Sequence, residues 1–347
     1  NTYYTKYRER LQGKKTGFPF LCVRELIFSI RSIIIEKIPT EEKRGWQEMK
    51  DVITVATMRE SDAHTIALYV PSRELMYRAA MGVYQAVNWQ GKKVAIFTGS
   101  GNNGGDGYAL AGILADHSVP CCLYQVSEHY SEDGKYYYDQ AVEKGVERKR
   151  FSEGEDLSRY DILVDCLLGT GFSGPVRGAF QQAIQAINRA KAYVVSVDIN
   201  SGMNGDTGKG DLVVRSDLTV TIGYLKAGMF LGEAVWKVGR LVVADIGIRL
   251  VREDFFLATP EEMVFPRSGL SLQSSQVTMM TPGEAESVSK NGQTIPDVAQ
   301  EIALRSQRLV RVLGKHSLVT DGYRTYFMEE GEYPAEIASL GEGERKE

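Results

Sequence analysis

The sequence lacks the signatures of the commonest nucleophilic and phosphoryl-transfer enzymes. It contains no G-x-S-x-G nucleophile elbow and no G-x-x-x-x-G-K-[ST] phosphate loop, so nothing supports hydrolysis through a serine or transfer of a phosphoryl group. Histidine is also scarce. The four histidines are His64, His117, His129 and His316, and we interpret each as a structural or solvated side chain. A histidine-based active site is therefore not expected.

An excess of positive charge is absent as well. The chain has 347 residues with 41 basic and 45 acidic side chains, a formal net charge of −4. A field that attracts nucleic acid irrespective of its sequence is missing, and a small molecule is the expected partner. The few cysteines, four in all, have no CxxC or zinc-ligand spacing. This favours reduced thiols in a cytoplasmic protein.

Long hydrophobic runs are missing too. The apolar stretch Leu26–Ile35 is interrupted by Ser29, Arg31 and Ser32, which leaves it too short for a membrane span and poorly shaped for a signal peptide. Neither membrane insertion nor export is expected. Residues 1–48 are predicted to be a poorly defined N-terminal extension that contains one amphipathic helix, either upstream of the working domain or docked against it.

Between residues 49 and 250, apolar strands alternate with helical patterns. A capping box, Thr57-Met-Arg-Glu60, opens a helix predicted through Tyr69, and a second helix is predicted over Arg73–Trp89. The strands and helices predicted next are Val94–Phe97, Ala109–His117, Cys121–Val126, Tyr136–Lys144, Ile162–Leu168, Ala179–Arg189, Tyr193–Ile199, Leu218–Ile222 and Leu241–Ile246. Such alternation predicts an α/β fold: a doubly wound, Rossmann-like, mostly parallel sheet with helices on both faces, in three αβα layers.

A glycine loop follows the first of these strands. Thr98–Tyr108 reads TGSGNNGGDGY and satisfies G-x-G-x-x-G, a pattern that lets a backbone approach a pyrophosphate at a helix start. Asp106 is predicted in the first helical turn, where its charge favours the helix dipole but opposes a pyrophosphate. That acid argues against an ordinary dehydrogenase. The alternative is a plain glycine turn with a capping acid.

Two further glycine loops follow later strands. They are Asp165–Pro175 (DCLLGTGFSGP) and Asp198–Gly208 (DINSGMNGDTG). Because the carboxyl ends of parallel strands share one edge, all three loops are predicted to open there. The edge would then be rich in amides, hydroxyls and carboxylates, including Asn200, which suit hydroxyl-bearing ligands and hard cations.

Two charged side chains at this edge are candidates for chemistry. Asp198, at a strand end, is the preferred general acid or base; the alternative is an acid that only braces the amides of residues 200–202. Lys226 follows the fifth strand in TIGYLKAG, from where it would orient a phosphate or assist proton transfer. The alternative for Lys226 is a solvated lysine.

Taken together, these segments resemble the NAD(P)H-hydrate epimerase family, the N-terminal domain of the bifunctional nicotinamide-nucleotide repair enzymes. The matching segments are Ser72–Ala80, Gly99–Gly107, Asp165–Pro175, Asp198–Gly208 and Thr221–Gly228. The resemblance covers residues 49–250 and implies epimerisation at C6 of hydrated NADH or NADPH (NADHX, NADPHX), with Asp198 and Lys226 as catalytic candidates. The reacting carbon, C6, is a carbinolamine centre. Its inversion can be written equally well through an iminium ion or through ring opening.

The resemblance also implies a set of ligand contacts. The implied substrate-binding residues are Asn102, Asn103, Gly104, Gly105, Asp106, Gly169, Thr170, Gly171, Phe172, Ser173, Gly174, Pro175 and Asp198. The implied cofactor is one potassium ion per subunit, held by Asn103, Asp165 and Ser201. A homodimer is implied as well.

The C-terminal part resembles, in fragments, the partner hydrate dehydratase. After a predicted linker, 251–265, residues 266–347 carry Thr281–Glu286 and Leu313–Tyr326 as matching pieces. Where that domain has a glycine-rich segment ending in G-S-G-D, this chain has Gly331–Glu344, which lacks it. We therefore predict a short remnant, a partly disordered appendage or a docking element, without dehydratase activity. Its expected structure is a helix over 296–311 and a hairpin around Asp321–Gly322.

Two rival functions remain open for the α/β domain. One is a non-catalytic binding or scaffold module on the same fold, which would not need the polar edge formed by Asn102–Asp106, Asp165 and Asp198. The other is a redox dehydrogenase, which the acid in the glycine loop and the absence of a hydride-site histidine oppose.

Overall fold

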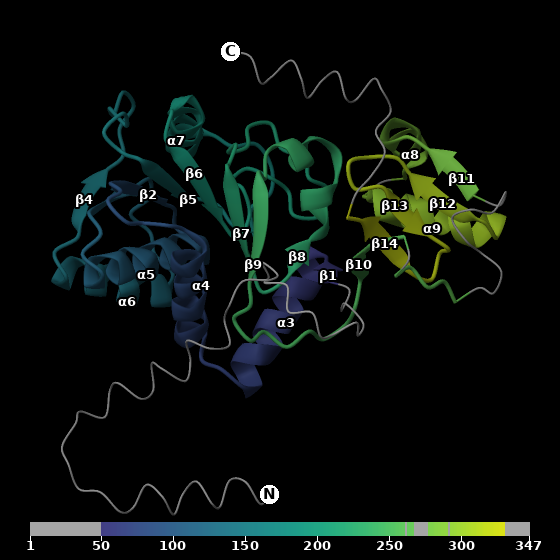
Figure 1. Cartoon of the computed structure of the whole chain (residues 1–347), viewed down its shortest axis with the longest axis horizontal. Helices are drawn as coiled ribbons and strands as arrows, with labels where there is room; N and C mark the ends of the chain where they lie inside the picture. The colour runs from purple at the N-terminus through teal and green to yellow at the C-terminus, as the bar shows by residue number, and fades with distance from the viewer. Residues whose placement is uncertain (1–49, 261, 267–276, 291, 330–347) are drawn as a thin grey trace, which may run out of the picture. The chain divides into compact units, whose positions relative to one another are not determined.

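The computed structural model describes residues 50–260, 262–266, 277–290 and 292–329. Within these ranges it contains two seven-stranded sheets (Figure 1). The predicted extension 1–48 and the segment Gly331–Glu344 lie outside the described residues. Among the described helices, none is both long and apolar enough to cross a membrane.

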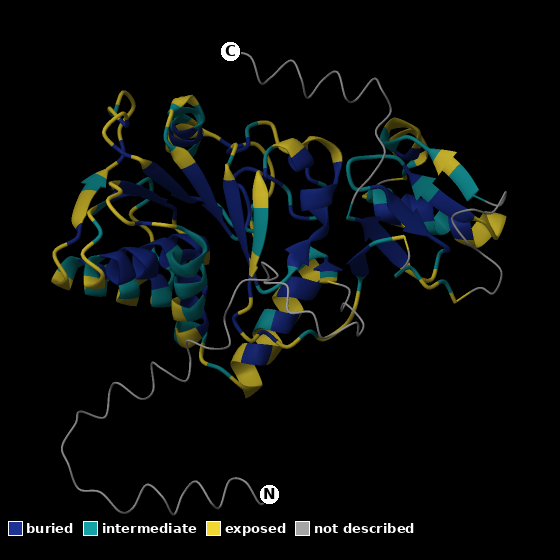
Figure 2. Ribbon diagram, viewed as in Figure 1, coloured by how far each residue is buried: buried dark blue, intermediate teal, exposed yellow. Residues whose placement is uncertain are grey.

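One sheet is entirely parallel and forms the predicted α/β domain. Its strands lie in the order β4 (Glu147–Arg150), β3 (Cys121–Gln125), β2 (Val94–Thr98), β5 (Ile162–Cys166), β6 (Tyr193–Val197), β7 (Leu218–Ile222) and β9 (Arg240–Ala244). Strands β2, β5 and β7 are buried along their whole length (Figure 2). This is expected of strands that are covered on both faces.

Helices cover both faces of this sheet. On one face lie α4 (Ser72–Ala86), α5 (Asn102–Asp116) and α6 (Glu132–Glu143), and on the other lies α7 (Gly178–Arg189) (Figure 1). Leu110 of α5 shares a core with Ile96, whereas Ile184 of α7 shares a second core with Phe97. Because neighbouring strand residues point to opposite faces, this alternation confirms the predicted doubly wound, three-layer αβα fold.

The second sheet joins the C-terminal residues to the start of the described chain. Its order is β11 (Val277–Met280), β12 (Leu309–Val312), β13 (Leu318–Thr320), β14 (Thr325–Met328), β10 (Phe255–Ala258), β1 (Lys50–Ile53) and β8 (Leu225–Lys226). Strand β1 pairs with β10 on one side and with β8 on the other. The segment 251–265, predicted as a linker, thus contributes a strand through which this sheet continues.

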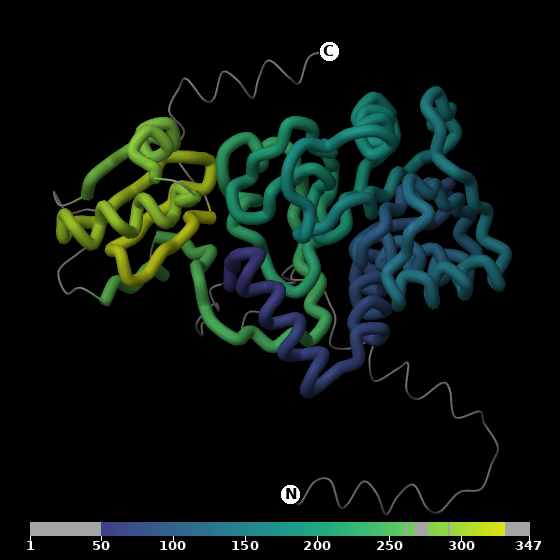
Figure 3. The backbone as a smooth tube through the Cα atoms, turned by 180° about the vertical axis from the view of Figure 1, so that it is seen from behind, coloured from purple at the N-terminus to yellow at the C-terminus, as the bar shows by residue number. Residues whose placement is uncertain are grey.

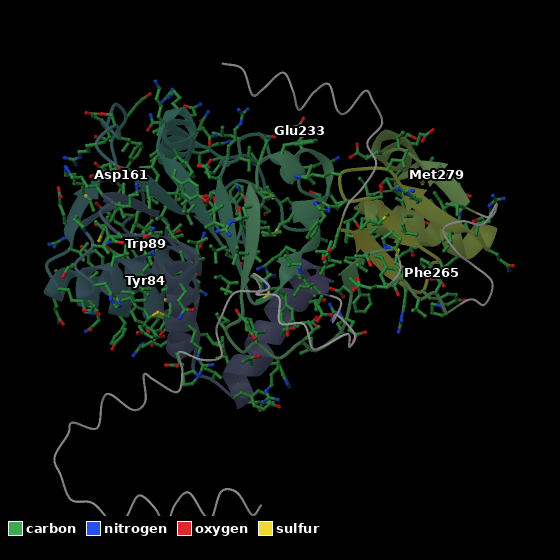
Figure 4. The ribbon with its side chains drawn as sticks, in the orientation of Figure 1. Tyr84, Trp89, Asp161, Glu233, Phe265 and Met279 are labelled. Atoms are coloured by element: carbon green, nitrogen blue, oxygen red, sulfur yellow. The ribbon has the colours of Figure 1, made fainter. Side chains whose placement is uncertain are left out.

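Two helices and an aromatic contact accompany the second sheet. They are α8 (Pro282–Val288) and α9 (Ile295–Ser306), and Ala299 and Ala303 of α9 join the core of Val310 and Leu318. Phe265, labelled in Figure 4, packs edge-on against Tyr326 with ring centroids 5.4 Å apart. The hairpin predicted around Asp321–Gly322 is confirmed as the antiparallel pair β13 and β14.

Several predicted boundaries are wrong for local reasons. Helix α3 (Val55–Leu68) is capped by Thr54, whose hydroxyl accepts a hydrogen bond from the backbone N–H of Thr57, so the capping box does not begin at Thr57. The helix predicted through residue 311 ends at Ser306, because Gln307 adopts a left-handed conformation (φ 55°) and strand β12 follows. Helix α5 begins at Asn102, inside the predicted loop.

Candidate active site

The first glycine loop is shaped by contacts that exclude side chains. A Cβ on Gly99 would lie 1.9 Å from the carbonyl oxygen of Leu167, and a Cβ on Gly104 would lie 2.3 Å from the carbonyl oxygen of Gly99. These distances leave room for hydrogen only. The loop therefore packs its backbone against the end of β5, and the first N–H groups of α5 stay available for an anion.

The second glycine loop lies beside the first. A Cβ on Gly169 would lie 3.3 Å from Cβ of Asn103 and 3.7 Å from Oδ2 of Asp198. Beyond Gly169, the stretch through Pro175 is exposed or half-buried, and Gly174 has φ 90°. The predicted meeting of the three loops at one edge is thus observed.

Asp165 is the acid that braces these loops. Its buried carboxylate accepts hydrogen bonds from the backbone N–H of Leu167 (3.2 Å), the hydroxyl of Ser196 (2.8 Å), and both the hydroxyl (2.5 Å) and N–H (2.9 Å) of Ser201. Burial raises the pKa of Asp165, and these hydrogen bonds oppose the rise. The alternative for Asp198 was an acid that braces the amides of residues 200–202. Asp165 has that role in the structure, because it accepts from the N–H of Ser201.

The residues expected to surround potassium are brought together. Asn103 donates from Nδ2 to the carbonyl oxygen of Leu168 (3.1 Å), and Oγ of Ser201 lies 3.2 Å from the same oxygen. Ser201 in turn contacts Asp165. Oδ1 of Asn103 is buried and accepts no hydrogen bond from any described residue. An unsatisfied oxygen beside a carbonyl, a hydroxyl and a carboxylate is a donor set that a hard cation prefers.

Asp198 and Lys226 form an ion pair at the centre of the edge. Nζ of Lys226 donates to Oδ1 of Asp198 (2.6 Å), to Oγ1 of Thr221 (2.8 Å) and to the carbonyl oxygen of Ile222 (2.8 Å). The lysine side chain is 0% exposed and that of Asp198 is 17% exposed. The alternative of a solvated Lys226 is wrong, since its three N–H donors are all engaged within the protein.

The backbone at Asp198 is also unusual. Asp198 has φ 67°, a left-handed conformation that costs free energy for a residue with a side chain. Oδ1 is held by Lys226, whereas Oδ2 faces Gly169 of the second loop. The strand end thus presents one carboxylate oxygen toward the place where the glycine loops meet.

Two more carboxylates belong to the same cluster. Burial, and then the negative charges of Asp198 and Asp62, raise the pKa of Asp106 well above its usual value, and the Lys226 ammonium opposes this rise. Burial and the charge of Asp198 also raise the pKa of Asp62, again opposed by Lys226. Since α5 begins at Asn102, Asp106 lies in the second helical turn and not in the first as predicted.

Sequence reasoning missed Asp62. It lies on α3, outside the glycine loops, and no local motif marks it. Asn200 was expected at the edge but is wholly buried away from it: Nδ2 donates to the carbonyl oxygens of Val214 (3.0 Å) and Lys237 (2.8 Å). The amide of Asn200 is therefore a structural group.

Comparisons with known proteins identify the family of this chain. Residues 72–228 match the family model described as YjeF-related protein N-terminus. NAD(P)H-hydrate epimerase from Weissella koreensis is 35% identical over 58% of this chain and 93% of its own length, and the same-named protein from Oenococcus oeni is 37% identical over 54% and 92%. The crystal structure of yeast ynu0 has 22% identity and a TM-score of 0.48 over 59% of this chain and 95% of that one. The chain belongs to the NAD(P)H-hydrate epimerase family.

Proposed function

We propose that this chain is an isomerase that interconverts the R and S forms of hydrated NADH and NADPH in nicotinamide-nucleotide repair. The observation that carries this proposal is the Asp198–Lys226 pair, 2.6 Å apart, at the edge where three glycine loops meet. The curated relatives bear the epimerase name over nearly their whole length. A binding or scaffold module would gain nothing from a buried lysine paired with a carboxylate in a strained conformation.

The glycine loops and the Asp198–Lys226 pair have different roles in this proposal. The N–H groups of Asn102–Gly104, of Gly169–Gly171 and of Ser173 hold the pyrophosphate and nicotinamide parts of the substrate, so that C6 lies near Asp198. Oδ2 of Asp198 exchanges a proton with the C6 hydroxyl, and N1 of the ring supplies the electron pair that forms the iminium ion. Lys226 does not reach the substrate. It acts as a positioning residue, because it fixes Oδ1 and so orients Oδ2.

A potassium ion is part of the proposal. Oδ1 of Asn103, the carboxylate of Asp165 and the hydroxyl of Ser201 would hold it, since they gather around the Leu168 carbonyl and Asn103 offers a buried oxygen without a described partner. The ion would supply positive charge behind the loops that hold the phosphates. No step of the proton transfer depends on it.

The remaining parts of the proposal concern the chain as a whole. We propose a homodimer in the cytoplasm; the free thiols Cys121, Cys122 and Cys166 fit a reducing compartment. Residues 266–347 are proposed to be a dehydratase remnant without dehydratase activity, because Gly331–Glu344 does not carry the G-S-G-D ending.

The first test follows conversion of purified R into S hydrated NADH by chromatography. We expect the full chain to convert it far faster than buffer, and Asp198→Asn to lose about 10²-fold or more of the rate while staying folded. Wild-type protein that binds the substrate without converting it would favour the binding-module alternative. An Asp198→Asn variant with the wild-type rate would remove Asp198 from the mechanism.

A further inference from the structure

Asp62 is a carboxylate near the candidate site that does not belong to the glycine loops. It is half-buried on α3, and its charge interacts with those of Asp198 and Lys226. No described residue donates a hydrogen bond to it, whereas Asp165 accepts from three residues. A half-buried acid that the protein leaves uncommitted is available to a ligand.

Helix α3 is held in place by contacts at several points. At its start, the N–H of Val55 donates to Asp206 (2.7 Å) in the third glycine loop. Further along, the hydroxyls of Ser61 and Thr65 accept from the N–H groups of Val251 (3.2 Å) and Arg249 (2.9 Å). Figure 3 shows this helix beside the segment that follows β9. Asp62 is therefore carried on a fixed element.

Helical spacing places Asp62 on the face of α3 that packs near Lys226. Met58 lies one turn before Asp62, so the two side chains share a face of α3. Met58 contacts the turn between β7 and β8, where its methyl group would lie 3.3 Å from a Cβ on Gly223. That turn follows Ile222, whose carbonyl oxygen accepts from Lys226. The face of α3 that carries Met58 and Asp62 thus packs near the turn that anchors the Asp198–Lys226 pair.

Inversion at C6 through an iminium ion requires proton transfer on both faces of the ring. The hydroxyl leaves from one face as water after it gains a proton, and water adds on the opposite face as it loses one. A single carboxylate beside a ring held in one orientation reaches only one face. An epimerase of this type therefore needs two proton carriers, and Asp198 is one.

We propose that Asp62 is the second proton carrier and serves the ring face opposite to the one served by Asp198; this inference rests on the proposed epimerase function. In one direction, Asp62 gives its proton to the C6 hydroxyl, water leaves, and the N1 electron pair forms the C=N bond. Water then adds on the other face, and Asp198 takes its proton. One water leaves and one is consumed, one proton passes from Asp62 to Asp198, and the reverse reaction exchanges the roles.

Asp106 is the competing candidate. Its pKa is raised further than that of Asp62, because it is more desolvated and interacts with both other acids. Asp106 lies on α5, the helix that starts from the first glycine loop, and is assigned to hold the substrate there.

Isotope exchange tests the assignment. Each epimer of hydrated NADH is incubated in ¹⁸O-water with the full-length protein, and label and inversion are measured after chromatographic separation. Wild type is expected to label both epimers at the rate of inversion. In Asp62→Asn, we expect the rate of inversion to fall about 10²-fold or more, while one epimer still exchanges its hydroxyl with the solvent. In Asp198→Asn, we expect the other epimer to be the one that still exchanges its hydroxyl. Glu60→Gln, an exposed acid on the same helix, serves as the control with wild-type behaviour.

Each remaining outcome overturns the inference. It fails if folded Asp62→Asn inverts at the wild-type rate, if it loses exchange in both epimers, or if Asp62→Asn and Asp198→Asn label the same epimer. It also fails if Asp106→Asn produces the one-sided exchange instead, or if wild type inverts without label, since the C–O bond then stays intact. Absence of inversion by wild type would refute the proposed function itself, which is a separate result.

Discussion

Replacing Lys226 by Met should destabilise the fold far more than replacing a lysine whose ion pair has nearly the same length. The Lys226–Asp198 pair measures 2.6 Å with side chains 0% and 17% exposed, and the Lys135–Asp139 pair measures 2.5 Å with both side chains 52% exposed. An exposed pair contributes about 0.2–1 kcal/mol. Breaking a buried pair costs about 3–5 kcal/mol, because the remaining charge stays desolvated.

The structure sets the expected magnitude for Lys226→Met near the lower end of that range. Asp198 keeps some contact with water, which reduces the penalty, but Thr221 and Ile222 also lose the donor to their buried oxygens, at about 1 kcal/mol each. We expect the free energy of unfolding to fall by about 3 kcal/mol, and by less than about 1 kcal/mol in Lys135→Met.

Urea unfolding of both variants and of wild type measures the two losses in free energy of unfolding. The dependence of that free energy on urea concentration is compared among the three proteins. Equal losses in the two variants, or a Lys226→Met loss below about 0.5 kcal/mol, would refute the argument that burial makes this pair matter. Activity gives a second readout. Without Lys226, the Asp198 carboxylate is no longer fixed, so epimerisation should also slow.

Three further predictions follow from the same site. Gly99→Ala should lose about 3 kcal/mol or more, because its Cβ would lie 1.9 Å from the Leu167 carbonyl oxygen, whereas Gly101→Ala, with no atom within 4 Å, should lose less than about 1 kcal/mol in urea unfolding. The raised pKa of Asp106 means that the folded state binds its proton more tightly, so stability falls as pH rises above about 4; the stability of Asp106→Asn relative to wild type should therefore increase as pH rises above about 4, and a pH-independent difference would contradict this. Potassium chloride should raise the melting temperature above that in choline chloride, and Asn103→Ala should abolish the difference; an equal shift in that variant would place the ion elsewhere.

The loops of the candidate site were predictable because each follows a buried strand. In a parallel sheet all carboxyl ends point the same way, so the sequence order alone brings Asp165, Asp198 and the first glycine loop to one edge. The start of α5 was not predictable, since glycine disfavours helix. Here close packing overrides that preference: a Cβ on Gly105 would lie 2.5 Å from the methyl group of Met76.

The rest of the site depends on long-range contacts that leave no local pattern. Lysine is rarely buried, and only the three acceptors around its Nζ explain why Lys226 has no exposed surface. In the sequence, Asp62 is one of several polar residues of a helix whose buried residues are themselves mostly polar. Its proximity to Asp198 follows from the packing of α3 against the turn between β7 and β8, which no spacing along the chain reveals.

The two sheets contribute different residues to the candidate site. Asp198 and the glycine loops extend from the parallel sheet, whereas Lys226 lies on β8 of the second sheet and Asp62 on the helix that follows β1. Ile53 of β1 is the direct partner of Lys226, and on its other side β1 pairs with β10. The C-terminal strands therefore support the candidate site through β1, because they belong to the same sheet as β8, which carries Lys226. None of the residues assigned to the chemistry lies on them.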